Sequence, residues 1–218
     1  MTIHQNTDGM IQMPTIPLFS SPVSLVTLNN NFDKLKEILV NSEYIRAGGG
    51  QVERTESVNI LNHPDLKVEK KAIFDVTETY KNAVFSYMST GMEITSSWGT
   101  RTYERCSGQF HYHANSLFSG ILYFDDIPKN HGGSLEFTNM SSPANAYHLE
   151  PSIINEYNSK SFTVIPEKNL CVLFPSYLYH RIQRYIGKPT RYSLAWNVFP
   201  TNKFGSGDSV LNLSHQDL

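Results

Sequence analysis

The sequence predicts a mainly β protein in which N-terminal helices precede a double-sheet jelly roll, that is, a double-stranded β-helix. Helical spacing of apolar residues is confined to residues 30–90, before Gly91. After Gly91 the chain breaks into short β-like runs separated by Gly, Pro, Asn and Asp. Because no helical pattern lies between these runs, an antiparallel sandwich or barrel is favoured over a parallel α/β sheet.

The N-terminal quarter predicts little regular structure. Residues 1–14 are polar and are expected to form a loose terminus. Residues 16–28, interrupted by Pro22, are typical of an edge-type strand pair. Asn30 or Asn31 is expected to cap a short helix, whose apolar residues are Phe32, Leu35, Ile38 and Leu39.

A longer helix is predicted from about Asp65 to Ser89, closed by Gly91. Its apolar face consists of Ile73, Val76, Tyr80, Val84 and Tyr87. We expect it to support the sheet without taking part in chemistry. The polar, glycine-rich connection 47–64 before it is a candidate binding loop or lid.

The β-like runs after Gly91 are separated by turn residues. They are 92–104, 109–113, 117–125, 134–138, 161–165, 170–174, 178–184 and 190–199. We therefore expect one domain over 1–218, with helical support at about 30–90, a jelly-roll core at about 92–200 and a C-terminal tail at 201–218.

Composition narrows the class of protein. The 218 residues are 39% hydrophobic and 17% charged with a formal net charge of −2, so a globular protein is expected and a nucleic-acid partner is not. The first residues lack the basic and apolar regions of a signal peptide, and no apolar run reaches the ~20 residues of a membrane span. Two cysteines form no disulfide framework, so we expect a cytoplasmic protein without a membrane partner.

Two histidines one residue apart, His111 and His113, precede an apolar run. In a strand, residues i and i+2 point to the same side, so both imidazoles can enter one pocket and share a metal ion. The same spacing also occurs in strands whose histidines lie side by side in water.

A second group of polar residues lies near the C-terminal end. His180 follows Phe174-Pro175, and Arg191 and Ser193 share one face of the last predicted strand. A third imidazole would complete a set of metal ligands. The planar guanidinium of Arg191 and the hydroxyl of Ser193 suit a carboxylate of an anionic co-substrate.

These residues resemble the jelly-roll (cupin-like) Fe(II)/2-oxoglutarate-dependent oxygenases, and in particular a prolyl-hydroxylase-like branch with an H-x-H-x-N-S-x-x-S-G-x-x-Y block. Here the block runs from His111 to Tyr123. The resemblance extends over about 94–199 and includes Ser97-Trp98, Gly132-Gly133 with Glu136-Phe137, residues 173–176, His180, Arg191, Ser193 and Asn197.

The resemblance implies Fe(II) as metal, 2-oxoglutarate as co-substrate and O2 as oxidant. His111, His113 and His180 would be the catalytic metal ligands. The 5-carboxylate of 2-oxoglutarate would meet Arg191 and Ser193, with a further hydrogen bond from Tyr103 or Tyr123.

One position departs from the pattern of the wider superfamily, which has Asp or Glu as the second ligand where this chain has His113. Three neutral imidazoles can also bind Fe(II), leaving it more positive. Alternatively, Asp125, Asp126 or Glu136 supplies an oxygen ligand. Asn115, at i+4 from His111, is a candidate oxygen ligand or a hydrogen-bond partner of the ligands.

Two functions remain open at this point. The first is a dioxygenase that hydroxylates a small molecule or a peptide, such as a prolyl residue. The second is a non-catalytic jelly-roll module that binds a metal or another ligand. Arg191 discriminates between them, because a simple metal-binding module has no need of a carboxylate anchor.

Overall fold

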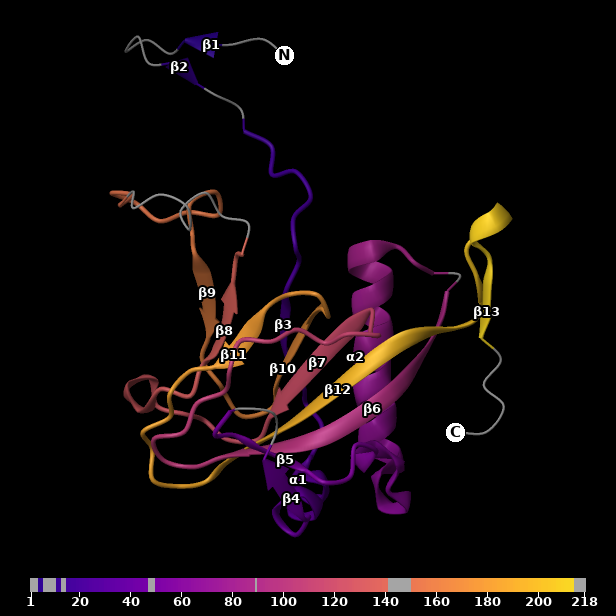
Figure 1. Cartoon of the computed structure of the whole chain (residues 1–218), viewed down its shortest axis with the longest axis vertical. Coiled ribbons are helices and arrows are strands. Elements are labelled where there is room, and N and C mark those ends of the chain that lie inside the picture. Colours follow the sequence, from indigo (N-terminus) through magenta and orange to yellow (C-terminus); the bar gives the residue numbers. More distant parts are fainter. Residues whose placement is uncertain are drawn as a thin grey trace.

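The structure, a computed structural model, describes residues 4–5, 11–12, 15–46, 50–88, 90–140 and 150–213. It confirms the predicted class, a mainly β fold with helices in the N-terminal half. Figure 1 shows a large twisted sheet with a long helix along it, a smaller group of strands beside it, and an N-terminal segment that leads away from the body.

The elements follow the chain in this order. The helices are α1 (Asp33–Val40) and α2 (Lys67–Phe85), with single 3-10 turns at Ile60–Asn62, Pro64–Leu66, Lys129–His131 and Gly207–Ser209. The strands are β1 (His4–Gln5), β2 (Ile11–Gln12), β3 (Ser24–Thr27), β4 (Tyr44–Arg46), β5 (Glu53–Thr55), β6 (Gly91–Thr102), β7 (Phe118–Tyr123), β8 (Leu135–Thr138), β9 (Ser161–Val164), β10 (Leu170–Pro175), β11 (His180–Ile182), β12 (Arg191–Phe204) and β13 (Leu211–Leu213).

Two antiparallel sheets form the jelly roll. The large sheet has the order β3-β10-β7-β12-β6-β5-β4, with β13 attached to β12, and the small sheet has the order β11-β8-β9. The central strands β7 and β10 are buried along their whole length, as expected of apolar runs covered on both faces. An apolar cluster that includes Leu135, Phe137 and Phe174 fills the space between the sheets.

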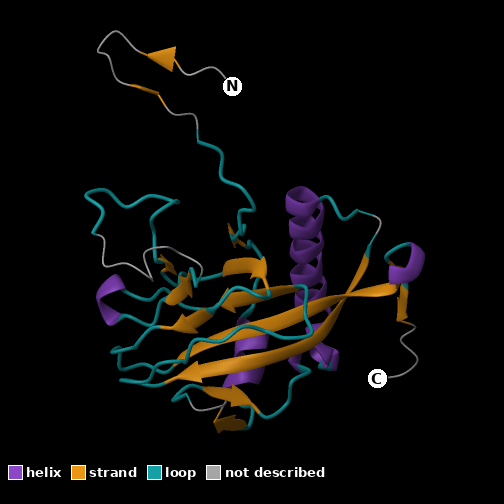
Figure 2. Ribbon diagram, turned by 45° about the horizontal axis from the view of Figure 1, so that its top comes forward, coloured by secondary structure: helices purple, strands orange, loops and turns teal. Residues whose placement is uncertain are grey.

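The helices cover the outer face of the large sheet, and Figure 2 shows them on one side of the strands. The side chains of β12 alternate, so that Leu194 and Trp196 join the helical side while Ala195 faces the small sheet. Trp196 Nε1 donates a hydrogen bond to Thr77 Oγ1 of α2 at 3.1 Å. The predicted support of the sheet by the long helix is therefore confirmed.

A glycine in β7 makes room for this tryptophan. A Cβ on Gly120 would lie 2.1 Å from Cζ2 of Trp196, closer than non-bonded atoms can approach. The small residue of one strand thus accommodates the largest side chain of its neighbour, because Gly120 pairs directly with Trp196.

The helix ends differ in detail from the predictions. The N-cap of α1 is Phe32, without a side-chain capping bond, so the expected cap at Asn30 or Asn31 is wrong. Asn31 Oδ1 instead accepts a hydrogen bond from the backbone N–H of Asp33 at 2.7 Å, just before the helix. α2 ends at Phe85 because Ser86 adopts a left-handed conformation (φ 57°). Closure by Gly91 was therefore wrong, and Gly91 begins β6 instead.

The predicted strand pair at 16–28 is also wrong. Only β3 forms there, paired with β10, and the preceding residues run over the surface with Phe19 97% exposed. Pro17 and Pro22 lack the backbone N–H that a ladder requires, which explains why no partner strand forms. The terminus expected to be loose contains the short pair β1–β2.

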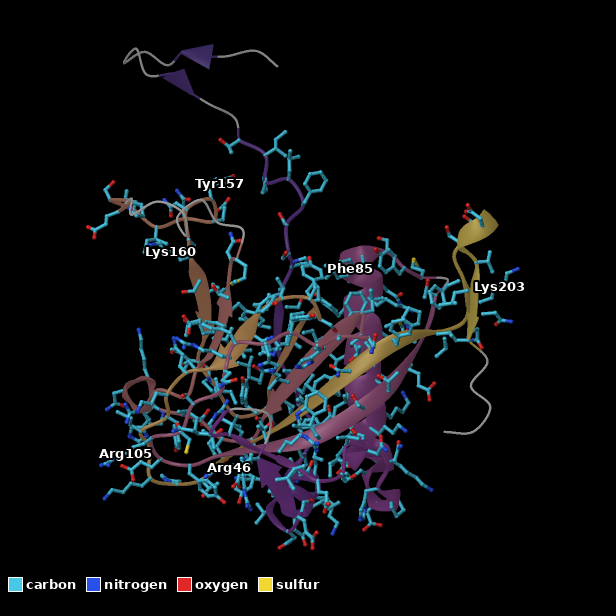
Figure 3. All side chains as sticks on the ribbon, in the orientation of Figure 1. Arg46, Phe85, Arg105, Tyr157, Lys160 and Lys203 are labelled. Atoms are coloured by element: carbon cyan, nitrogen blue, oxygen red, sulfur yellow. The ribbon has the colours of Figure 1, made fainter. Side chains whose placement is uncertain are left out.

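Two segments predicted as loop or tail contain strands. Within 47–64, β5 pairs with β4 and with β6, while residues 47–49 lie outside the described residues. At the other end, β12 continues to Phe204 and β13 returns along it; residues 214–218 lie outside the described part. Figure 3 shows Lys203 on this hairpin, at the edge of the molecule.

Candidate active site

Three histidines from two segments meet between the sheets. His111 and His180 face each other in an antiparallel bridge, in which their backbone N–H and C=O groups exchange hydrogen bonds of 3.0 and 2.9 Å. The backbone N–H of His113 donates to the carbonyl of Ser176 at 2.9 Å. One ring nitrogen of each histidine lies within 4.8 Å of the others. The convergence predicted from the sequence is present.

The local structure around His111 differs from the prediction. Residues 109–113 form no regular strand, only the bridge to His180, yet both imidazoles reach the cluster. The chain then turns at Asn115, which has a positive φ of 54° and is exposed. The i+4 argument for Asn115 therefore fails, because the extended segment ends before it, and this residue does not line the cavity.

Each imidazole uses Nδ1 for a hydrogen bond. His111 Nδ1 lies 2.9 Å from the carbonyl oxygen of residue 109, and His180 Nδ1 lies 2.8 Å from that of residue 178. His113 Nδ1 lies 2.6 Å from Asn197 Oδ1. Because these oxygens only accept, each ring carries its proton on Nδ1, which leaves the lone pair of Nε2 for a metal ion.

Burial keeps two of these rings neutral. It lowers the pKa of His113 to about 4 and that of His180 to about 3, because a charged imidazole is poorly solvated there. Repulsion from His111 lowers both further. Neutral imidazole is the form that binds a metal ion, so both ligands are ready near neutral pH.

The carboxylates that were alternative ligands lie elsewhere. Asp125 and Glu136 form ion pairs with a lysine at 2.6 Å and an arginine at 2.7 Å, and Asp126 accepts a backbone N–H at 2.8 Å. Among the described residues, the three histidines are the group whose side chains converge as metal ligands. The geometry therefore favours His113 over a carboxylate.

A cavity of about 320 Å³ extends from the histidines into the jelly roll. Arg191, the first residue of β12, lines it and is 3% exposed. Its Nη1 donates to Thr102 Oγ1 at 3.4 Å, but its Nε and Nη2 are buried and have no partner. A buried guanidinium with two unpaired donor atoms costs folding free energy unless a ligand accepts hydrogen bonds from them. A carboxylate suits this task, because its two oxygens match the planar geometry of the guanidinium.

Tyr123 and Ser193 lie beside Arg191. The hydroxyl of Tyr123 is buried without a hydrogen-bond partner, and the Arg191 Cζ lies 5.0 Å from the centre of its ring. Ser193 pairs with Tyr123 across β7 and β12 and also lines the cavity. Tyr103 is 38% exposed, lies near Arg101 and does not line the cavity. Of the two candidate tyrosines, the structure brings only Tyr123 to Arg191.

A polar network behind His113 was not predicted. Ser119 Oγ lies 2.8 Å from His113 Nδ1 and donates to Asn197 Oδ1 at 2.8 Å, and it also contacts Ser176 Oγ at 2.8 Å. Asn197 follows Arg191 by six residues, so the alternation of β12 places it on the cavity side. That spacing is the sequence signal that could have identified it.

Residues 96–197 match the family model described as putative 2OG-Fe(II) oxygenase. This part of the chain is similar to 2OG-Fe(II) oxygenases. The matched segment contains the three histidines, Arg191 and the network around Asn197. The narrower branch suggested by the H-x-H-x-N-S block stays a prediction.

Several solved structures share the fold at low sequence identity. An oxidoreductase of this family from Burkholderia pseudomallei is 10% identical with a TM-score of 0.59, covering 81% of this chain and 84% of its own. HygX from Streptomyces hygroscopicus, with nickel and 2-oxoglutarate bound, is 12% identical with a TM-score of 0.57, covering 83% and 84%. A Pseudomonas putida prolyl-4-hydroxylase is 15% identical with a TM-score of 0.55, covering 83% and 94%.

None of the curated proteins matches the chain. Within the described residues, no helix has the length and apolar character needed to cross a bilayer.

Proposed function

We propose that this protein is an Fe(II)- and 2-oxoglutarate-dependent dioxygenase that hydroxylates a small molecule or a peptide. The observation that carries the proposal is the buried Arg191, whose two free donors point to a carboxylate ligand in the cavity that the three histidines also line. A non-catalytic metal-binding module is not favoured, because it would leave the buried guanidinium of Arg191 without an anionic partner.

The metal site would consist of His111, His113 and His180. The hydrogen bonds at Nδ1 of all three rings leave Nε2 for a divalent ion that accepts nitrogen ligands. Fe(II), when bound with 2-oxoglutarate and O2, supplies the oxidising power for insertion of oxygen into a C–H bond. The protein contributes the positions of the ligands and the exclusion of water.

The co-substrate would bind along the floor of the cavity. Arg191 would hold its distal carboxylate through Nε and Nη2, and Tyr123 and Ser193 would add hydroxyl donors. Apolar walls that include Trp98, Ile121 and Leu135 keep bulk water from this region.

The substrate would enter on the side of His111, the exposed member of the triad, where the cluster meets solvent. The connection expected to act as a binding loop contributes Gly50, Val52 and Arg54 to the cavity wall, which supports a role in substrate contact. A reducing cytoplasm would suit both Fe(II) and the two free cysteines.

An anaerobic titration tests the proposal. Fe(II) and 2-oxoglutarate added together are expected to produce a weak visible charge-transfer band that neither produces alone. On admission of air, succinate should form, and a product 16 daltons heavier should appear in a pool of peptides or metabolites that contains the substrate. A protein that binds Fe(II) but gives neither band nor succinate would contradict the proposal.

A further inference from the structure

The lining of the cavity is positively charged and contains no acid. Among the described lining residues there are two arginines, Arg54 and Arg191, and the three histidines, but no Asp or Glu. The Arg54 guanidinium is turned to the backbone carbonyls of residues 55 and 56, at 2.8 and 3.1 Å. Arg191 is therefore the one buried cation of this lining with free donors.

The charge of the assembled site does not balance. A divalent metal and Arg191 bring three positive charges, while a 2-oxoglutarate dianion brings two negative ones. A carboxylate among the ligands would neutralise the remainder, but the third member of the cluster is His113 and not Asp or Glu. By this count one positive charge stays uncompensated at the cavity, and such a charge attracts an anion.

Among the residues that the structure describes, no group lining the cavity supplies that negative charge. Burial raises the pKa of the Tyr123 hydroxyl above its ordinary value, so this phenol stays neutral. Asp125 and Glu136 already neutralise other cations. The missing charge must come from a molecule that enters the cavity.

We propose that the cavity binds a monovalent anion beside the histidine cluster, together with the metal and 2-oxoglutarate. The anion is either a carboxylate group of the substrate or a free halide, which share one negative charge and the ability to approach a metal ion. This inference rests on the proposed function, because the balance counts the metal and the co-substrate. It narrows the substrate to a carboxylate-bearing molecule if the halide does not bind.

The test uses the full chain loaded anaerobically with Co(II), whose visible absorption reports its ligands. Binding of Co(II) and of 2-oxoglutarate is measured first. Sodium acetate and sodium chloride are then titrated separately into the ternary complex, each replacing sodium perchlorate at constant ionic strength. We expect a saturable change in the Co(II) bands with at least one of the two anions.

Matched variants test the role of charge. His113→Asp introduces the negative charge that the site lacks, whereas His113→Asn has the same shape without it. The Asp variant should bind the anion roughly tenfold or more weakly than the Asn variant, because the added charge removes the attraction. If either variant fails to bind Co(II), the corresponding pair at His111 replaces it.

The outcomes separate the two proposals. Saturation by chloride alone assigns the anion to a free halide, and saturation by acetate assigns it to a substrate carboxylate. Normal binding of Co(II) and 2-oxoglutarate without a response to either anion overturns the inference but leaves the proposed function intact, as does equal anion affinity of the Asp and Asn variants. Failure of 2-oxoglutarate to bind the Co(II) protein overturns both.

Discussion

His113 Nδ1 and Asn197 Oδ1 lie 2.6 Å apart and join two segments separated by 84 positions. The amide oxygen accepts the ring proton, and Ser119 donates to the same oxygen. An amide at this position orients the imidazole without adding the negative charge that a carboxylate would bring.

Removal of this acceptor should weaken the metal site. Asn197→Ala leaves the His113 ring with one polar partner fewer, so we expect the affinity for Co(II) to fall about 10- to 100-fold. Asn197→Asp keeps an oxygen acceptor and should retain most of the affinity. Thermal unfolding of the metal-free proteins is the control, and an unchanged Co(II) affinity in the Ala variant would show that Asn197 does not position His113.

Loss of a triad member should abolish metal binding. We expect His111→Ala and His180→Ala to lose Fe(II) and Co(II) in equilibrium dialysis, because two remaining ligands compete poorly with water. Asp125→Asn and Glu136→Gln are the controls, since both carboxylates lie in other ion pairs. If a control loses the metal while His113→Ala keeps it, the all-histidine site is wrong.

Arg191→Ala should separate co-substrate binding from metal binding. We expect nearly unchanged metal affinity and a loss of about 2 to 5 kcal/mol in 2-oxoglutarate binding, because the carboxylate loses its buried partner. Arg191→Lys should recover part of the lost 2-oxoglutarate affinity, since lysine restores the positive charge but not the bidentate geometry of the guanidinium. Arg105→Ala, at a side chain 76% exposed, is the surface control. Equal 2-oxoglutarate affinity in all variants would place the anchor elsewhere.

The metal-free protein should lose stability in mild acid. His113 and His180 have folded-state pKa values of about 4 and about 3, below the ordinary 6.5, so the unfolded chain binds more protons between about pH 6.5 and pH 4. Their contribution is fully present above pH 6.5 and declines as the pH falls. By pH 5.5 the free energy of unfolding should be about 2 to 3 kcal/mol lower than at pH 7.5.

Urea unfolding at the two pH values measures this difference. The control is the His113→Gln/His180→Gln double variant, which lacks both titrating rings and should show a clearly smaller dependence on pH over the same range. An equal pH dependence in the two proteins would assign the effect to other groups.

Gly120→Ala should destabilise the fold. The added methyl group would overlap the Trp196 ring, with Cζ2 at 2.1 Å, and we expect a loss of about 1 to 3 kcal/mol or more in unfolding free energy. Trp196→Phe removes the ring atoms that the methyl group meets. The double variant should therefore lose less than the sum of the two single losses, and strict additivity in this cycle would show that the two residues do not interact.

The sequence predicted most of the strand segments of the jelly roll and the convergence of His111, His113 and His180, because alternation and the resemblance to known oxygenases carry that information. It failed where tertiary contacts decide. Ser86 ends α2 because it adopts a left-handed conformation, which is not predicted for a serine from the sequence. Ser119 and Asn197 meet beside His113 only after β7 and β12 have paired, so the spacing from Arg191 places Asn197 on the correct face of β12 but does not reveal these hydrogen bonds. The division of 1–218 into one domain stays a prediction.

Strand β12 carries both the cation of the cavity, Arg191, and the anchor of the helical layer, Trp196, on opposite faces. Arg191 and Trp196 are five residues apart on one strand, so a shift of either residue moves the other. Melting of α2 away from the sheet is therefore expected to displace Arg191 and disturb the cavity. Heat inactivation and the loss of α2 from the sheet should occur as one event, at one temperature.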